Sequence, residues 1–249
     1  MAVALNADEC QIYTDVDGIF TTDPRVCSKA RLLKEVSFEE MLELSSSGAK
    51  VLQLRSVEYA SKFNLPIRVL SSFNEGNGTL VQEEKNIMER PIVSGISSID
   101  TEAKLTIRGV PDVPGIAAKI LSPISEAGIE VDVIVQNISA DNCTDFTFTV
   151  DKGDAENAKE ILQKTSVSLG GGLVEVDHDI AKISVVGRGM RAHAGVASKM
   201  FQALAKDEIN ISMSTTSEIK ISVVIKESEM KKAVTALHNA FDLDKELDS

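Results

Sequence analysis

The sequence predicts a two-part protein: an α/β segment at the front, followed by two small α+β modules that share one order of elements. Three observations support this. Short apolar strands alternate with amphipathic helices up to about Gln82. The chain then repeats itself, so that Gly195 lies 80 residues after Gly115 in the matched copies. An apolar content of 43% in 249 residues is enough for cores in two or three domains.

The front segment is expected to hold three strands and two helices. Residues 11–14 form a short strand, and residues 37–44 form a helix with Ser37 as N-cap and Glu40 at the capping-box position. Residues 51–63 have the spacing of a second amphipathic helix. The buried strand IRVLSSF follows Pro66, and the Gly/Asn turn in NEGNGTLV leads into a third strand.

Each copy of the repeat contains a strand, a Gly-containing loop, a helix, two further strands and a second helix. The first copy ends with one more strand, GLVEVDHD, whereas no strand follows the last helix of the second copy. The strand PIVSGISSI, before the first copy, has no partner of its own. We therefore expect it to complete the second sheet, so that the modules are interleaved.

These patterns predict four stretches of chain. Residues 1–82 are the front segment, and residues 83–98 hold a charged linker, EEKNIMERP, with the strand that completes the second module. Residues 99–177 are the first module and residues 178–249 are the second.

Composition argues against several classes of partner. A net charge of −12 repels phosphate backbones and anionic lipids, and the 26 Lys and Arg residues are scattered along the chain. No run of 18 apolar residues exists and no signal peptide precedes the first strand, so we expect a cytoplasmic protein that binds neither nucleic acid nor membrane.

The cysteines and histidines predict no metal site. Cys10, Cys27 and Cys143 are odd in number and widely spaced, which favours reduced, structural thiols. His178 and His193, together with His238, lack metal-ligand spacing and are expected in ordinary surface or loop positions.

The stretch TDVDGIFTTDPR at 14–25 is an acid-rich loop with a central glycine, typical of a loop placed against a nucleotide. The same residue types also form ordinary turns. A calcium loop is a poor alternative because Gly18 falls at the fourth loop position rather than the sixth, and the twelfth position from Asp15 is Val26.

Several longer stretches carry a resemblance to a known family. In the front segment they are YTDVDGIFTTDPR, SFEEMLEL, GAKVLQLRSVEYA and PIRVLSSF; behind it they are GVPDVPGIAAKI, IVQN, GMRAHAGVASKMF and STTSEIKISVVI. In this order, over essentially the whole chain, the sequence resembles the aspartate kinase family. The resemblance implies part of an amino-acid-kinase α/β sheet, followed by two interleaved ferredoxin-like βαββαβ ACT domains.

The family's activity is the phosphorylation of the aspartate side chain by ATP with magnesium, the first step toward lysine, threonine and methionine. The resemblance implies that Lys50 lies near the transferring group as a catalytic residue. It also implies that the adenosine and phosphates are lined by Thr14, Asp15, Phe20, Thr21, Thr22, Asp23, Pro24 and Arg25. Asp15 or Asp23 can bind ribose or magnesium, and Arg25 supplies positive charge.

The ACT pair is expected to bind end-product amino acids, with lysine and threonine the usual effectors. Pro114 is placed at a helix start, where the free amides of Gly115, Ile116 and Ala117 attract a carboxylate. Asp112 meets the ammonium group, and Gln136 or Asn137 fixes orientation. By resemblance the effector sites comprise Asp112, Val113, Pro114, Gly115, Ile116, Ala117, Glu130, Val131, Asp132, Gln136, Val196, Ala197, Asn210, Ile211, Ser217 and Glu218.

The second copy offers similar geometry through residues 193–197, with residues 210, 211, 217 and 218 on its strands. Ala194 stands where many relatives have proline, which leaves the ligand preference of this loop open.

The sequence also departs from the family. It contains no KFGGT-like loop, and residues 2–5 resemble the tail of a helix. We therefore expect a C-terminal portion of an aspartate kinase that binds effectors, forms a homodimer or pairs with complete kinase chains, and has no turnover alone.

Three alternatives remain at this point. The first is that the chain is a stand-alone amino-acid sensor, and the second is that it is a self-sufficient ATP-dependent phosphotransferase. A dehydrogenase is the weakest alternative, because the GxG in VVGRGMRAHAG precedes a strand, NISMSTT, that lacks a terminal acid to hold ribose.

Overall fold

The computed structural model describes residues 1–84, 92–138, 143–170, 172–193 and 195–245. The chain divides into two compact units. Unit 1 comprises Met1–Ile99 and Lys182–Ser249, and unit 2 comprises Asp100–Ala181. Most of the charged linker that we predicted, and the position of Ala194, lie outside the described residues.

The front segment of unit 1 forms a four-stranded sheet with the order β1-β3-β4-β2. The strands are β1 (Cys10–Thr14), β2 (Glu35–Ser37), β3 (Ile67–Ser71) and β4 (Thr79–Gln82). Strands β1 and β3 are parallel, whereas β4 runs antiparallel to β3. The three-strand prediction was therefore incomplete: β2 was missed because three residues that run directly into a helix cap show no alternation.

Two helices pack on this sheet, α1 (Phe38–Ser46) and α2 (Leu54–Lys62), and a short 3₁₀ helix spans Val3–Leu5. The predicted capping box is confirmed, since Ser37 and Glu40 exchange hydrogen bonds at the start of α1. Helix α2 begins at Leu54 rather than at Val51, because Gln53 has an extended backbone and Leu52 enters the core from the preceding turn. The core between helices and sheet is built around Met41, Leu44, Val57, Ile67 and Val69.

The rest of unit 1 is the second module, whose sheet has the order β11-β12-β10-β5. Its strands are β5 (Gly95–Ile99), β10 (Ile180–Val186), β11 (Met213–Thr216) and β12 (Lys220–Lys226). Its helices are α5 (Val196–Lys206) and α6 (Met230–Ala240), with 3₁₀ turns at Arg188–Ala192 and Glu227–Glu229. Strand β5 pairs antiparallel with β10, so the predicted interleaving is confirmed.

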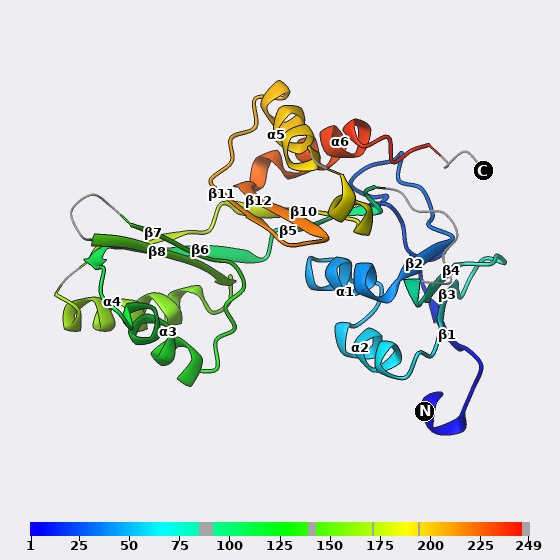
Figure 1. The fold of residues 1–249 in the computed structure, drawn as a ribbon, viewed down its shortest axis with the longest axis horizontal. Coiled ribbons are helices and arrows are strands. Elements are labelled where there is room, and N and C mark those ends of the chain that lie inside the picture. The colour runs from blue at the N-terminus through cyan, green and yellow to red at the C-terminus, as the bar shows by residue number, and fades with distance from the viewer. Residues whose placement is uncertain (85–91, 139–142, 171, 194, 246–249) are drawn as a thin grey trace. The chain divides into compact units, whose positions relative to one another are not determined.

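This second sheet is covered on both faces. Every residue of β10 is buried, and Figure 1 shows α5 and α6 on one side of the sheet and α1 on the other. Val186 joins the core cluster of the front segment, and Nζ of Lys220 on β12 lies 2.7 Å from Oε2 of Glu43 on α1. Within unit 1 the front segment is therefore packed directly on the second module.

Unit 2 is the first module, with the predicted order βαββαβ. It contains β6 (Glu102–Pro111), α3 (Ile116–Glu126), β7 (Ile134–Ile138), β8 (Cys143–Asp151), α4 (Ala155–Ser168) and β9 (Val174–Asp177). The antiparallel sheet has the order β7-β8-β6-β9. Leu105, Ile107, Phe146, Phe148 and Leu162 lie at the centre of its core.

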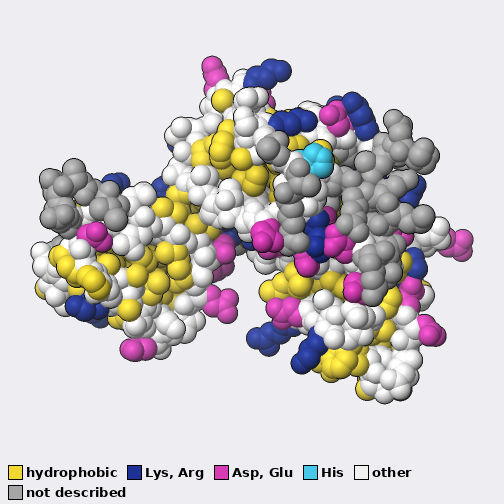
Figure 2. Space-filling model, in the orientation of Figure 1, with side chains coloured by type: hydrophobic (Ala, Val, Ile, Leu, Met, Phe, Trp, Pro, Cys, Tyr) yellow, Lys and Arg dark blue, Asp and Glu magenta, His cyan; other side chains and the backbone are white. Residues whose placement is uncertain are grey.

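The surface agrees with the scattered charge of the sequence. On the described part of the face in Figure 2, Lys and Arg side chains lie singly among acidic ones rather than in a continuous stripe. The three cysteines are free, and Cys27 is buried. Among the described residues, no helix combines the length and the apolar character that a membrane crossing needs.

Candidate functional site

The loop at 14–25 begins at the carboxyl end of β1. Because β1 and β3 are parallel, Thr14 and Ser71 lie side by side at the same edge of the sheet, and the Ser72 N–H donates to the Thr14 carbonyl at 2.7 Å. Asn74, on the loop after β3, donates to Oδ1 of Asp17 at 2.9 Å. Ligands of α/β sheets bind in the crevice outside such carboxyl ends, so this edge is the candidate nucleotide site.

The base of the loop is a short antiparallel ladder. The Leu33 N–H donates to the Ile19 carbonyl at 2.8 Å, Phe20 and Leu32 form an isolated bridge, and the Thr21 N–H donates to the Arg31 carbonyl at 2.8 Å. Residues 22–30 therefore project from a closed base. This ladder joins positions ten or more residues apart, which local pattern did not predict.

In the first part of this loop, Asp23 and Arg25 bind each other. Nη2 of Arg25 lies 2.8 Å from Oδ2 of Asp23, and the Arg25 N–H donates to Oδ1 at 2.8 Å. The hydrogen bond from the Arg25 side chain holds the pKa of Asp23 below its usual value. Most of the Arg25 side chain, 89%, remains exposed. Its guanidinium can bind a phosphate, whereas Asp23 is already engaged and Asp15 is the more accessible carboxylate.

The predicted nucleotide residues differ in exposure. Asp15, Pro24 and Arg25 are exposed, and Thr14, Phe20 and Asp23 are partly buried. Thr21 and Thr22 are buried, and Oγ1 of Thr21 lies 2.9 Å from Nε2 of His238. Thr21 therefore faces the second module.

Lys50, the predicted catalytic residue, lies in the turn between α1 and α2 and is exposed. Within the described part of the chain, its side chain makes no hydrogen bond and no ion pair. Its place relative to a transferring phosphate thus stays a prediction. Among the described residues, no group of three or more His, Cys, Asp or Glu side chains gathers where it could hold a metal ion.

In unit 2 the first predicted effector loop joins β6 to α3. Helix α3 begins at Ile116 with Gly115 as N-cap, so Pro114 precedes the helix instead of opening it. Gly115 has φ of 88°, a conformation that glycine adopts without strain, and a Cβ there would meet no heavy atom within 4 Å. The Ile116 amide was wrongly predicted to be free, because it donates to the Val113 carbonyl at 3.2 Å.

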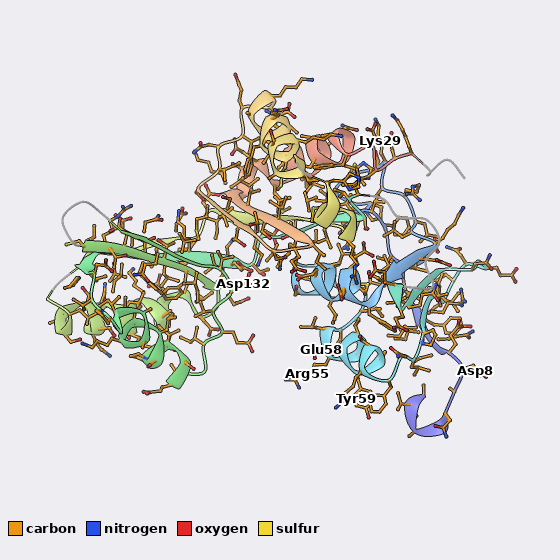
Figure 3. All side chains as sticks on the ribbon, in the orientation of Figure 1. Asp8, Lys29, Arg55, Glu58, Tyr59 and Asp132 are labelled. Carbon is orange, nitrogen blue, oxygen red and sulfur yellow. The ribbon has the colours of Figure 1, made fainter. Side chains whose placement is uncertain are left out.

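The strand register separates the predicted residues of this module. Gln136 and Asn137 pair with Phe146 and Asp145, toward the end of the sheet where β6 enters the predicted effector loop. Asp132, labelled in Figure 3, lies in the α3–β7 connection, and its N–H donates to the Thr149 carbonyl near the other end. The predicted effector residues of this module therefore form two groups, one near each end of the sheet.

The second module repeats this arrangement. Helix α5 begins at Val196 with Gly195 as N-cap, at φ of 99°. Asn210 and Ile211 precede β11, and Ser217 and Glu218 form the turn between β11 and β12, so the prediction that placed these four on strands was wrong. A strand pattern of this kind cannot locate the ends of a short hairpin.

The turn of the second module and its helix loop lie at the same end of the sheet. The Gly187 N–H, just after β10, donates to the Ile219 carbonyl at 2.9 Å. Residues 210 and 211 lie at the opposite end, because the neighbouring Ser212 N–H donates to the Val224 carbonyl. In both modules, the helix that begins after a glycine N-cap starts near one end of the sheet. The other end carries residues 130–132 in the first module and residues 210–211 in the second.

His238 was expected at the surface or in a loop, and this was wrong. It lies on α6 and is fully buried together with Ala233, Val234 and Leu237. Its spacing of four residues from Val234 was the sequence signal for a core-facing position. Burial lowers the pKa of His238 below its usual value, nearby Lys29 and Arg31 act in the same direction, and Asp244 opposes them.

Comparison with known proteins defines the class of this protein. The pattern of the amino acid kinase family matches residues 1–71, and ACT-domain patterns match residues 105–166 and 183–241. The fold and these matches together define the C-terminal part of an amino acid kinase that carries a pair of ACT domains.

The relatives specify the family. The aspartokinase of Pseudomonas aeruginosa is 61% identical over 98% of this chain and 60% of its own length. The regulatory subunit of aspartate kinase from Thermus thermophilus is 39% identical, with a TM-score of 0.58, over 60% of this chain and 99% of that chain. The aspartate kinase of Clostridium acetobutylicum shares the fold, with a TM-score of 0.86 at 24% identity over 96% of this chain and 56% of that one. The chain belongs to the aspartate kinase family.

The chain spans about 60% of the length of the curated relatives that it matches.

Proposed function

We propose that this chain senses feedback amino acids, lysine or threonine, for the aspartate kinase reaction, in which ATP and L-aspartate give 4-phospho-L-aspartate. The observation that carries this proposal is the repeated Gly-capped helix start after the first strand of each module, with Gly115 at φ of 88° and Gly195 at 99°. The same backbone conformation at matched places of the repeat indicates two related ligand loops.

The chemistry of these loops suits a free amino acid. A helix N-terminus attracts the α-carboxylate, which every free amino acid carries. In the first module Asp112 is partly buried beside this helix start and is the candidate partner of the ammonium group. Glu130 and Asp132, in the group near the other sheet end, supply charge for a cationic side chain such as that of lysine. We propose that a second copy of this chain brings the two groups into one site.

The front segment supplies part of an ATP site. Asp15 is the candidate for magnesium or ribose, Arg25 for a phosphate, and Lys50 for the transferring group. Phosphoryl transfer needs positive donors and metal ions around the γ-phosphate from several sides. The printed sequence contains no KFGGT-like loop, so we propose that this chain alone does not phosphorylate aspartate.

Association is the second part of the proposal. Strand β7 is an edge of the sheet in unit 2, and β11 is an edge of the second sheet. Unpaired backbone groups on edge strands favour pairing with another chain. We propose a homodimer, or a complex with complete kinase chains, formed through these modules.

The proposal is tested by isothermal titration of the purified chain with lysine and with threonine. At least one should release or absorb heat with a saturable isotherm, whereas glutamine, which is not an end product of the proposed pathway, should not. No heat with lysine or threonine would refute the sensing function. A coupled assay with ATP, magnesium and aspartate tests the proposed lack of kinase activity, and turnover would refute it.

A stand-alone sensor is the second candidate, because the matched regulatory subunit of Thermus thermophilus is covered almost completely by this chain. The two candidates differ in partner. Co-purification of the tagged chain with complete aspartokinase subunits supports the first, and effector binding without any such association supports the second.

A further inference from the structure

Thr21 joins the base of the nucleotide loop to the second module through its backbone and side chain. Its side chain is 0% exposed, so it cannot touch a nucleotide directly. The Arg31 N–H donates to its Oγ1 at 2.9 Å, which closes the loop base together with the backbone ladder. Its carbonyl accepts the Ile96 N–H of β5 at 2.7 Å, and its hydroxyl meets Nε2 of His238 on α6 at 2.9 Å.

The loop has another polar tether on α6. Nζ of Lys29 lies 3.4 Å from Oδ1 of Asn239, the residue after His238. Figure 3 labels Lys29 beside the C-terminal end of this helix. Two neighbouring residues of α6 therefore bind the loop, one at its closed base and one on its exposed arm.

Stability alone does not account for a histidine at this position. The imidazole is fully buried, and its Nδ1 has no hydrogen-bond partner within the described residues. An unsatisfied buried polar atom is unfavourable by more than one neutral hydrogen bond returns. A leucine, like its neighbour Leu237, would fill the same apolar face without that penalty. What the histidine adds is a directed bond to the hydroxyl of Thr21.

We propose that His238 is a positioning residue for the nucleotide loop. Through Thr21 it holds residues 22–30 so that the Asp23–Arg25 pair faces the carboxyl edge of β1 and β3. The second module thereby sets the geometry of a loop that belongs to the front segment. This inference rests on the proposed role of residues 14–25 in binding a nucleotide.

The loop itself supplies a readout. Trypsin cleaves after Arg25, Lys29 and Arg31, which all lie on or beside it, and loosening of the base exposes these bonds. We would measure the initial cleavage rates at these bonds in the purified 249-residue chain by mass spectrometry. Cleavage after Lys62 and Lys206 in the same unit serves as the internal reference.

Three variants separate positioning from packing. His238→Leu removes the bond to Thr21 and should raise loop cleavage, relative to the reference sites, about five- to tenfold. His238→Gln retains a polar atom near the Nε2 position and should restore the rate to within about twofold of the unmodified chain. Val234→Ala is the matched control: it creates a small cavity on the same buried face of α6 and should leave the relative rate unchanged.

MgATP is the second arm. It should slow loop cleavage in the unmodified chain, and the concentration for half protection should rise about fivefold or more in His238→Leu and recover in His238→Gln. Equal relative rates in His238→Leu and Val234→Ala would overturn the inference, as would an unchanged half-protection concentration. If MgATP protects no chain while His238→Leu still loosens the loop, the proposed nucleotide site is refuted, whereas the positioning of residues 22–30 by His238 is supported.

Discussion

The hydroxyl of Ser94 donates a 2.6 Å hydrogen bond to Oε1 of Glu40, and both side chains are buried. Ser94 immediately precedes β5 of the second module, whereas Glu40 belongs to the first turn of α1. The same Oε1 accepts the Arg188 N–H at 3.2 Å, and Oε2 accepts the hydroxyl of Ser37 at 2.7 Å. One carboxylate thus joins the helix start, the approach to β5 and the end of β10.

Replacing Glu40 by alanine should lower the free energy of unfolding by about 3 kcal/mol, because several buried donors lose their acceptor at once. Glu40→Gln keeps the shape but not the charge, and should cost about half as much. Urea denaturation measures both. Glu58→Ala, on the exposed face of α2, is the control and should change stability by less than about 0.5 kcal/mol. Similar losses for Glu40 and Glu58 would show that this carboxylate is not a structural junction.

Stability should fall as the pH falls below about 6.5, the usual pKa of histidine. The pKa of His238 is lowered in the folded chain, so the unfolded chain binds the extra proton first and is favoured as the solution becomes acidic. The stability that uncharged His238 contributes is fully present above the pKa of the unfolded chain. It is lost as the pH falls from that value to the pKa of the folded chain.

The difference in unfolding free energy between pH 7.5 and pH 5.5 measures this effect. His238→Gln should show a smaller difference than the unmodified chain. His178, beside Glu156, is unchanged in both proteins, so its contribution cancels in the comparison. Identical pH dependence in the two chains would exclude His238 as the titrating group.

Asp112→Asn should weaken the binding of lysine or threonine to the first module about tenfold, since an amide replaces a charge-assisted partner of the ammonium group. Titration calorimetry measures the change. Glu160→Gln removes the same charge from the exposed side of α4 in the same unit and should leave affinity as it is. A loss of equal size in both variants would assign the effect to net charge rather than to the loop.

Phe148→Ala should destabilise unit 2 by about 3–5 kcal/mol, because a fully buried ring is lost from the centre of its core. Hydrogen exchange monitored by mass spectrometry should accelerate in β8 and α4 but not in α1, which belongs to the other unit. Phe73→Ala, at a ring that is 79% exposed, should accelerate neither. Equal acceleration in α1 would mean that the two units unfold together.

The parts of the fold that depend on neighbouring residues were predictable. The capping box at Ser37 needs only two side chains three residues apart, and the repeat revealed two modules of one topology. The interleaving followed from counting strands, since PIVSGISSI lacked a partner and the second module lacked a strand. In contrast, β2 is too short for a period, and the start of α2 depends on Leu52 entering the core.

Candidate sites were predicted less well because their geometry comes from residues far apart in sequence. The residues along 14–25 were assigned by resemblance, yet no local pattern shows that Thr21 turns away from solvent toward a helix more than 200 residues later. The ladder between Thr21 and Arg31 joins residues ten positions apart, which local pattern does not reveal either. Helix periodicity did indicate that His238 lies on the apolar face of its helix. The surface prediction was made because histidine is polar.

Strand β5 ends opposite the beginning of β10, with Ile99 paired to Lys182. The whole of unit 2 therefore leaves and re-enters the chain at two adjacent points of one antiparallel ladder. A two-residue hairpin turn could bridge those points, so the first module has the geometry of a cassette inserted into a β-hairpin. During synthesis β5 cannot pair with β10 until the residues of unit 2 have been made. The second sheet is therefore completed late and has a high contact order.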